Sequence, residues 1–270
     1  MVSSDKSSII KEVLMCRPNF FSISYTINPW MKIGSENKNL AQIQWNNLYQ
    51  TYLCLGIKVN ILDQQPGYPD MVFATDQGVV YGKKVLMSNF RFKERKGERK
   101  PYKEWFTDHG YEIKLIPDKA YFEGNGECLF FGQKLLIGIG FRANQLTCKY
   151  LSYALDTEVI PLELVNPFFY HLDTALFILN KETVFYYPEA FSKKSQKILK
   201  KLVPNLIALN DFEANNFAAN SVVTDHQVVI NKTLPNFRTT LAQLGYKAVE
   251  VDISEFAKAG GGAHCLTFVI

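Results

Sequence analysis

The stretch VVYGKKVLM, at residues 79–87, recurs in three variants along the chain. They read LFFGQKLLI at 129–137, LFILNKETVFYY at 176–187 and VVTDHQVVI at 222–230. Each is a pair of short apolar runs joined by a turn, which is the pattern of a β-hairpin. The turns follow one another about every 45 to 50 residues, a spacing typical of repeat architectures. We therefore expect a fold built from repeated units.

Each hairpin is followed by a stretch with helical apolar spacing and then by another short strand. Proline stands near the expected helix starts, at Pro101, Pro188 and Pro235, where its fixed φ suits the first turn. Glycine stands at the expected stops, at Gly110 and Gly245. The expected helices lie at 101–111, 144–155, 188–203 and 234–246, and the strands after them at 111–117, 158–164, 206–210 and 248–253.

The two ends of the chain supply a fifth unit. Residues 40–55 have helical spacing, and the strand IKVNILD follows at 57–63. EVLMCRP, at 12–18, is placed to pair with CLTFVI at 265–270. Such pairing closes the units into a ring and removes free strand edges. Because no Ser/Gly-rich linker interrupts the pattern, the predicted fold class is α/β, with five units around a central cavity in a single domain over residues 1–270.

The composition is that of an ordinary globular protein, with 47% hydrophobic and 21% charged residues among 270. The net charge of +4 is small for this length. The one dense basic stretch, residues 91–103, also contains Glu94 and Glu98, which is typical of a solvated face rather than of a nucleic-acid surface. No apolar run approaches the length of a membrane span. We expect neither nucleic acid nor a membrane as partner.

The five cysteines are Cys16, Cys54, Cys128, Cys148 and Cys265. Their odd number, their wide spacing and the lack of a CxxC pair argue against a disulfide framework and against a structural zinc site. The N-terminus mixes charge into every short apolar run, unlike a signal peptide. A reduced, cytoplasmic location is therefore expected.

The segments just before the hairpins are rich in Gly and Asn and carry side chains capable of chemistry. Loops at one end of a rigid scaffold are the usual place for catalytic groups. Taken singly, each segment also fits an ordinary turn whose Asp and Asn side chains satisfy backbone groups. If the units surround an axis, however, the side chains converge on one pocket. They are Asp70, Asp76, Glu123, His171, Asp173 and Cys265.

Cys265 and His171 are the candidate nucleophile and general acid/base. A Cys in an apolar strand is more often a small core residue, and His171 alone also fits a satisfied, half-buried histidine. Cys265, however, follows three glycines, 260–262, at the first position of the expected terminal strand, where a strand end meets a cavity. Because neighbouring strand residues point to opposite faces, we expect His264 to face away from the site.

Five segments resemble the motif set of one enzyme superfamily. They are PDMVFATD (69–76), FEGNGE (122–127), IGFRAN (139–144), HLDTA (171–175) and GGGAHCLT (260–267). In this order they are similar to the guanidino-group-modifying enzymes, which include arginine deiminase, dimethylarginine dimethylaminohydrolase and the amidinotransferases. The opening segment MCRPNFFSISYTINPWM (15–31) resembles the compact arginine-dihydrolase branch. The fold that this resemblance implies, the pentein, is a five-bladed α/β propeller, in agreement with the repeat count.

The resemblance implies a role for each matching residue. Cys265 corresponds to the nucleophile, His171 to the general acid/base and Glu123 to the carboxylate beside the histidine. Asp76 and Asp173 correspond to carboxylates that grip the guanidinium. The other implied substrate contacts are Asp70, Asn28, Arg142 and Arg95, the two arginines holding the substrate's α-carboxylate, with Arg91 as a rival to Arg95.

The resemblance also implies the reaction. It is hydrolysis of arginine or an N-methylated arginine through a thiouronium intermediate on Cys265, giving citrulline and ammonia or methylamine. Asp173, in the His-x-Asp pattern, favours unmethylated arginine, because dimethylarginine hydrolases usually have a basic residue there. The dihydrolase branch has Asn where this chain has Asp76, so onward hydrolysis to ornithine is left open.

Three other interpretations remain open. They are a dimethylarginine dimethylaminohydrolase proper, an amidinotransferase in which an amine replaces water, and a non-catalytic binding protein of the same fold. No cofactor or metal is expected, since the protein supplies every group that the reaction requires. The expected partner is a small guanidino substrate. Dimers occur in related enzymes, so a homodimer is allowed, and the sequence leaves the oligomeric state open.

Overall fold

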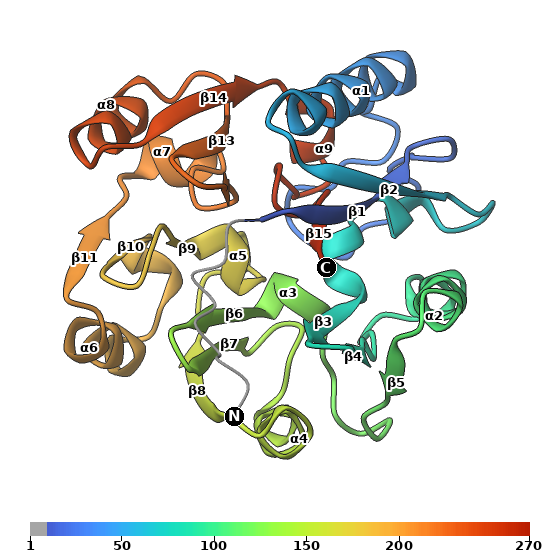
Figure 1. Ribbon diagram of the computed structural model, residues 1–270, viewed down its shortest axis with the longest axis horizontal. Coiled ribbons are helices and arrows are strands. Elements are labelled where there is room, and N and C mark those ends of the chain that lie inside the picture. The colour runs from blue at the N-terminus through green and yellow to red at the C-terminus, as the bar shows by residue number, and fades with distance from the viewer. Residues whose placement is uncertain (1–9) are drawn as a thin grey trace.

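The computed structural model describes residues 10–270, which form five small sheets arranged in a ring around one axis (Figure 1). Each sheet has three strands, and its middle strand pairs antiparallel with one neighbour and parallel with the other. The two parallel strands are joined by a helical crossover, as parallel pairing requires. The α/β propeller of five units predicted from the hairpin repeat is confirmed.

The first unit joins the two ends of the chain. β1 (Glu12–Arg17) lies between β15 (Phe268–Val269) and β2 (Lys58–Asp63), and α1 (Lys38–Cys54) connects β1 to β2. α1 begins after Asn37, whose side-chain oxygen accepts a hydrogen bond from the Leu40 N–H in the first turn. The antiparallel pairing of β1 with β15 confirms that the chain termini close the ring.

The other four units have the predicted order of hairpin, helix and strand. Gly82 and Gly132 occupy the left-handed region, at φ of 61° and 60°, which permits tight two-residue turns in the first two hairpins. The elements are β3 (Gly78–Tyr81), β4 (Lys84–Met87), α2 (Arg99–Asp108) and β5 (Glu112–Lys114); β6 (Cys128–Phe131), β7 (Lys134–Ile139), α4 (Gln145–Leu155) and β8 (Glu158–Glu163); β9 (Leu176–Ile178), β10 (Thr183–Tyr186), α6 (Lys193–Leu202) and β11 (Asn205–Ala208); and β12 (Val222–Val223), β13 (Gln227–Asn231), α8 (Pro235–Gln243) and β14 (Lys247–Val251).

The third predicted helix, α6, begins later than expected, at Lys193, because Pro188–Ala190 form a separate 3₁₀ turn and Ser192 caps the helix.

The segments before the hairpins are short helical turns rather than the loops that the sequence predicts. The turns before the hairpins are Pro69–Val72, Ala74–Gln77, α3 (Gly124–Glu127), α5 (Leu172–Ala175), α7 (Asp211–Asn215) and α9 (Ser254–Ala257).

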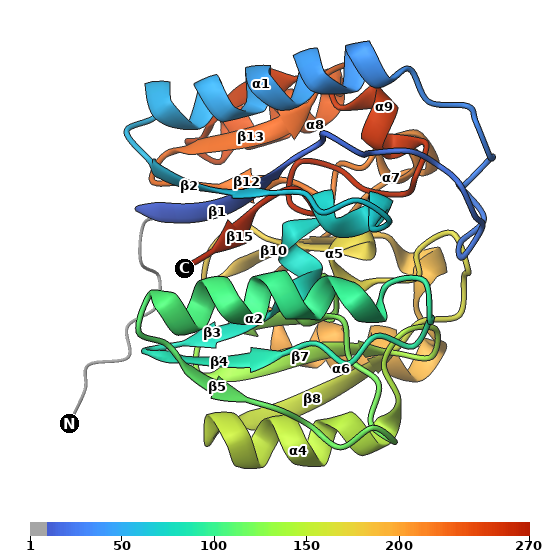
Figure 2. The same cartoon turned by 90° about the vertical axis from the view of Figure 1, so that its right-hand side faces the viewer.

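Apolar side chains fill the contacts between neighbouring sheets, so the core surrounds the axis instead of occupying it. Between the first two units, for example, Leu14 and Met87 pack with Phe106 and Phe268. The rings of Phe106 and Phe268 lie 5.2 Å apart. The long helices α1, α2 and α4 cover the outside of the ring (Figures 1 and 2). This arrangement leaves room near the axis for polar side chains.

Phe268→Ala should destabilise the fold by about 3–5 kcal/mol, because truncation of a buried ring leaves a cavity. Phe268 is 0% exposed and holds the C-terminal strand against the second unit. Urea unfolding measures the loss. Phe212→Ala is the control, since Phe212 is 57% exposed, and should cost less than about 0.5 kcal/mol. Equal losses in the two variants would contradict closure of the ring by the chain ends.

Candidate active site

The structure brings five of the predicted side chains together from different units of the ring. Asp76 comes from the turn before β3, Glu123 immediately precedes α3, and His171 immediately precedes α5. Asp173 lies within α5, and Cys265 lies in the turn before β15. All five are at most 3% exposed. Residues separated by almost two hundred positions in sequence therefore share one buried site.

His171 is held between two carboxylates. Its Nε2 lies 3.0 Å from Glu123 Oε2, and its Nδ1 lies 3.6 Å from Asp76 Oδ1. Burial alone would lower the pKa of His171, but Asp76 and Glu123 together raise this pKa to about 9. The imidazolium is therefore the favoured form at neutral pH, and His171 holds a proton that it can donate.

Glu123 is the ionised partner of this histidine. Its Oε2 also accepts a hydrogen bond from Arg142 Nη1 at 2.8 Å. Burial would raise the pKa of Glu123, but Arg142 and His171 lower it to about 2. Arg142 is held in turn by the rings of Phe92 and Tyr170, which lie 4.7 and 4.6 Å from its guanidinium carbon. The carboxylate thus stays negative throughout the physiological pH range.

Cys265 is a buried thiol between an amide and a carboxyl group. Asn220 Nδ2 donates to its sulfur at 3.1 Å, and the sulfur donates to Asp173 Oδ2 at 3.3 Å. Burial, followed by the charges of Asp173 and Asp76, raises the pKa of Cys265 well above its ordinary value. Without a ligand the site therefore favours the thiol, which is the less nucleophilic form.

Two of the buried carboxyl oxygens that lack a hydrogen-bond donor belong to the aspartates predicted to grip the guanidinium. They are Asp76 Oδ1 and Asp173 Oδ1, and neither has a hydrogen-bond partner within residues 10–270. A buried acceptor without a partner costs about 1–3 kcal/mol, so such groups are uncommon unless a ligand satisfies them. Both oxygens are free to accept hydrogen bonds from a ligand with several N–H groups.

The buried acids of the site outnumber the buried bases. Two guanidinium groups and one imidazole face six carboxyl groups in the described part of the chain. Buried acids in excess favour a cationic ligand, because a bound cation reduces their mutual repulsion. The acids are Asp70, Asp76, Glu98, Glu123, Glu127 and Asp173, and the bases are Arg95, Arg142 and His171.

The remaining predicted contacts lie around a small cavity next to Cys265. Its volume is only ≈ 10 Å³, so an amino acid enters only if its walls move. Part of the wall is the N-terminal segment that contains Ile27 and Met31. The predicted residues that line this cavity are Asn28, Asp70, Asp76, Arg95, Arg142 and Cys265.

The side chain of Arg95, and not that of its rival Arg91, lies at the site. Arg95 is 3% exposed and donates to Asp76 Oδ2 at 2.6 Å and to Glu98 Oε2 at 2.9 Å. Arg91 is exposed, and its guanidinium donates to the carbonyl of Phe141. Sequence position alone left the two arginines unresolved, and burial among acids separates them.

Two expectations about the C-terminal segment are wrong. Cys265 does not open a strand, since residues 263–266 form a turn and β15 begins at Phe268. The alternation of side chains along a strand therefore does not apply to its neighbour His264. His264 Nδ1 lies 2.9 Å from Asp173 Oδ2, so this histidine contacts the site instead of facing away.

Asn220 is the main site residue that the sequence analysis missed. Its Oδ1 accepts hydrogen bonds from the backbone N–H groups of Gly262 and Cys265, at 2.9 and 3.1 Å, and holds the turn that carries the nucleophile candidate. A signal was present, because Asn220 stands two residues before β12 as Asp76 stands two residues before β3.

Glu127 was also missed. It is fully buried, and its Oε2 accepts a hydrogen bond from the Glu123 N–H. Its Oε1 lies 3.8 Å from His171 Nε2. Burial and the neighbouring Glu123 raise the pKa of Glu127 to about 8. The pattern FEGNGE holds two glutamates, and nothing in their spacing indicates that both belong to the site.

Neither a metal-ligand cluster nor a membrane-spanning helix is found in the described part of the chain. Residues 10–270 contain no group of three or more His, Cys, Asp or Glu side chains placed to hold a metal ion. In the same range no helix combines the length and the apolar character needed to cross a membrane.

A buried Cys, His and Glu in an acidic site on the axis of a five-bladed α/β propeller define the pentein-fold enzymes that modify guanidino groups. The family described as N,N dimethylarginine dimethylhydrolase, eukaryotic, matches residues 18–270. The chain belongs to this dimethylarginine dimethylaminohydrolase family, and it is a hydrolase that acts on C–N bonds of guanidino groups.

Similar proteins include enzymes named for two substrates. The chain is 38% identical over 257 residues to the N(G),N(G)-dimethylarginine dimethylaminohydrolase of Mycobacterium tuberculosis, covering 95% of this chain and 84% of that protein. It is 38% identical over 261 residues to the bifunctional arginine dihydrolase/ornithine cyclodeaminase ArgZ of Synechocystis, covering 94% of this chain but only 37% of ArgZ. The crystal structure of the N-terminal domain of ArgZ bound to substrate matches with a TM-score of 0.92 and 36% identity, covering 95% of this chain and 97% of that domain.

Gly126→Ala should remove most of the activity on a guanidino substrate. A Cβ at this position would lie 2.6 Å from Asp76 Oδ1 and 2.8 Å from His171 Nδ1, so these side chains must shift. A displacement of about 1 Å at a catalytic group costs on the order of 100-fold in rate. Steady-state kinetics give kcat/KM. In the control Gly132→Ala, at a turn with no atom within 4 Å of the new Cβ, stability falls because φ is +60° but kcat/KM is kept. An unchanged kcat/KM in Gly126→Ala would contradict this geometry.

The free energy of unfolding should fall as pH rises from 6.5 to 9. The pKa of His171 is raised from 6.5 to about 9, so its contribution to stability is complete below pH 6.5 and is lost as pH rises through 9. The pKa of Glu127 is raised from 4.5 to about 8, so the folded state keeps a proton that the unfolded chain loses, and stability falls over that interval too.

Glu127→Gln removes the second titration and should give a shallower fall. Urea unfolding of wild type and variant at pH 6.5 and 9 measures both slopes. Stability that rises over this range in the wild type, or identical slopes in the two proteins, would contradict the assignment.

Proposed function

We propose that this enzyme hydrolyses the guanidinium group of arginine or of an N-methylated arginine to a ureido product, which is citrulline. The observation that supports this most directly is that Asp76 and Asp173 each bury one oxygen, Oδ1, without a hydrogen-bond partner within residues 10–270, while Asp173 Oδ2 accepts from the Cys265 sulfur. A guanidinium is a flat cation with N–H groups around its edge, and two carboxylates hold such a plane through charge-assisted hydrogen bonds. The structure of the ArgZ domain, an arginine dihydrolase, was obtained with substrate bound.

The bound cation activates the nucleophile. Burial and the charges of Asp173 and Asp76 raise the pKa of Cys265. A guanidinium between the two aspartates offsets their charges, so the thiol releases its proton to solvent when substrate binds. The thiolate then attacks the guanidinium carbon and forms an S–C bond. Carboxylates on both sides fix the carbon against the sulfur, and such positioning is worth on the order of 7 kcal/mol.

His171 donates a proton in the first half of the reaction and accepts one in the second half. As an imidazolium it donates a proton to the leaving nitrogen, the C–N bond breaks, and ammonia or an alkylamine departs from the thiouronium intermediate. Neutral His171 then takes one proton from water, whose oxygen attacks the same carbon. The S–C bond breaks, and the second proton of the water returns to the sulfur, which restores the Cys265 thiol and leaves a neutral ureido product. Glu123 stays ionised and stabilises the charged imidazole.

Arg142, Arg95, Asn28 and Asp70 are the proposed contacts for the rest of the substrate. Arg142 makes fewer hydrogen bonds than Arg95. Arg142 donates to Glu123 and to the carbonyl of Ile27. Arg95 donates to Asp76, to both oxygens of Glu98 and to a backbone carbonyl. We therefore assign the α-carboxylate first to Arg142. Substrate reaches these groups when the segment around Asn28 moves, given the small cavity.

Free arginine is the preferred substrate in this proposal. Asp173 accepts hydrogen bonds from an unmethylated nitrogen, which a dimethylated nitrogen cannot supply. Dimethylarginine is the second candidate, because the family match and the Mycobacterium relative carry its name.

Citrulline formation from arginine, dimethylarginine and agmatine, with citrulline itself supplied to detect onward hydrolysis, tests the proposal. Arginine should give citrulline, and agmatine should react poorly because it lacks the carboxylate. Cys265→Ser should lose about 10⁴-fold or more in kcat, as loss of a nucleophile does elsewhere. Cys54→Ser, at an exposed cysteine, is the matched control and should retain full activity.

Mass spectrometry of enzyme quenched during turnover should show an adduct on Cys265 alone. No ureido product from any of these compounds, or an adduct on another cysteine, would contradict the proposed function.

A further inference from the structure

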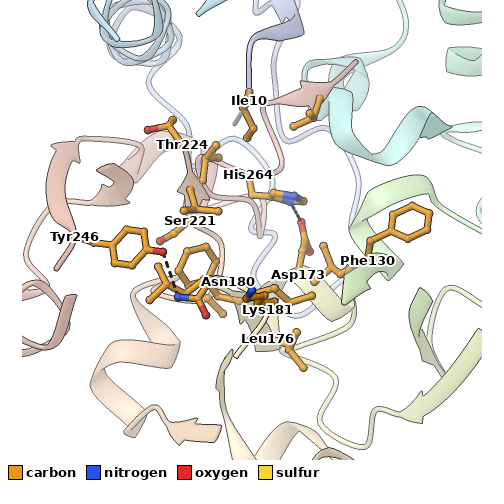
Figure 3. Close-up of a pocket in the computed structure, with 18 of the residues that line it drawn as sticks. Ile10, Phe130, Asp173, Leu176, Asn180, Lys181, Ser221, Thr224, Tyr246 and His264 are labelled. Carbon is orange, nitrogen blue, oxygen red and sulfur yellow. Dashed lines mark hydrogen bonds and ion pairs between the residues drawn. The ribbon is translucent and has the colours of Figure 1, made fainter. Parts of the chain in front are cut away.

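A second, larger cavity lies on the axis, on the side of the hairpin turns (Figure 3). Its volume is ≈ 560 Å³, and residues from the last two hairpins, such as Asn180 and Thr224, line it. Asp173 and His264 also line this cavity, and Figure 3 shows their side chains in contact. The cavity therefore reaches the back of the active site through this pair.

Asp173 Oδ2 is held from two sides. His264 Nδ1 lies 2.9 Å away, and the Cys265 sulfur donates to the same oxygen at 3.3 Å. An ionised carboxylate only accepts hydrogen bonds, so His264 Nδ1 carries a hydrogen in this contact. Asp173 Oδ1 has no partner among the described residues. The imidazole thus fixes which oxygen lies beside the sulfur and which stays free.

We propose that His264 is a positioning residue for the reaction. It anchors the carboxylate of Asp173 so that Oδ1 points to the guanidinium and Oδ2 stays beside Cys265. The proposal rests on the proposed function, because it assigns the free oxygen to the substrate. Without His264, the only side-chain donor that the structure describes for the carboxylate of Asp173 is Cys265 itself, which loses its hydrogen when it becomes a thiolate.

His264→Ala should lower kcat/KM for arginine by about 10- to 100-fold, with a higher KM and a lower kcat, since the grip on the guanidinium loosens. His264→Asn should recover most of the loss, because the Asn amide can place an N–H where Nδ1 stands. Urea unfolding of both variants shows whether either change acts through stability. A purely structural role would change stability and kcat/KM in parallel.

The cavity supplies a further test. The side chain of His264 is 15% exposed and lines this space, so added imidazole can occupy the room left in His264→Ala. We expect a saturable rise in kcat of this variant with imidazole and no rise in the wild type. His171→Ala is the control. His171 is 1% exposed and does not line the cavity, so imidazole should not restore this variant.

Recovery by Asn together with recovery by imidazole supports the inference. An active wild type whose His264→Ala variant is equally active overturns this inference alone, as does a defect that neither Asn nor imidazole repairs. A wild type that forms no ureido product from any guanidino compound removes the proposed function and this inference with it.

Discussion

Buried like charges repel strongly where water is excluded, and the axis of this propeller gathers six carboxyl groups. Two arginines and His171 offset part of that charge through short contacts, such as Arg95 to Asp76 at 2.6 Å. Burial, together with the charges of Asp173 and Asp76, keeps Cys265 protonated. A cation of the right shape removes the repulsion and activates the sulfur in the same step, so recognition and chemistry depend on one electrostatic constraint.

The ring makes this arrangement possible. Each unit buries most of its apolar residues against its neighbours, which leaves room at the centre of the ring for the polar side chains of the site. The turns before the hairpins then deliver one or two polar groups each to the centre. Closure by β1 and β15 fixes the last of them, because the turn that carries Cys265 leads directly into β15.

The sequence predicted what local patterns encode. Paired apolar runs around Gly82 and Gly132 predicted the hairpins, and helical apolar spacing with a stop at Gly110 predicted the helical crossovers. The resemblance to guanidino-modifying enzymes named the five central side chains. Neither the local patterns nor the resemblance predicted the backbone conformation at Cys265. Asn220, 45 residues away in sequence, holds the turn at Cys265, and a local sequence pattern cannot predict such a long-range contact.

The same limit explains the other differences. His264 was placed by strand alternation, which fails once the strand becomes a turn. Glu127 was overlooked because a glutamate four residues after Glu123 fits a solvated helix face equally well. The structure shows that Glu127 belongs to the site, because its side chain is buried and its Oε1 lies 3.8 Å from His171 Nε2. Groups that act through another residue are the hardest to predict, since their position depends on the finished fold.

The protonation state of Cys265 tests the account most directly. Thiolate absorbance in the ultraviolet, titrated with pH and corrected with Cys265→Ser, reports it with and without an alkylguanidinium ion that is not turned over. We predict that the free enzyme shows no Cys265 thiolate at neutral pH and that the guanidinium ion produces it. A thiolate already present at neutral pH in the free enzyme, or a titration that the cation leaves unchanged, would contradict the account.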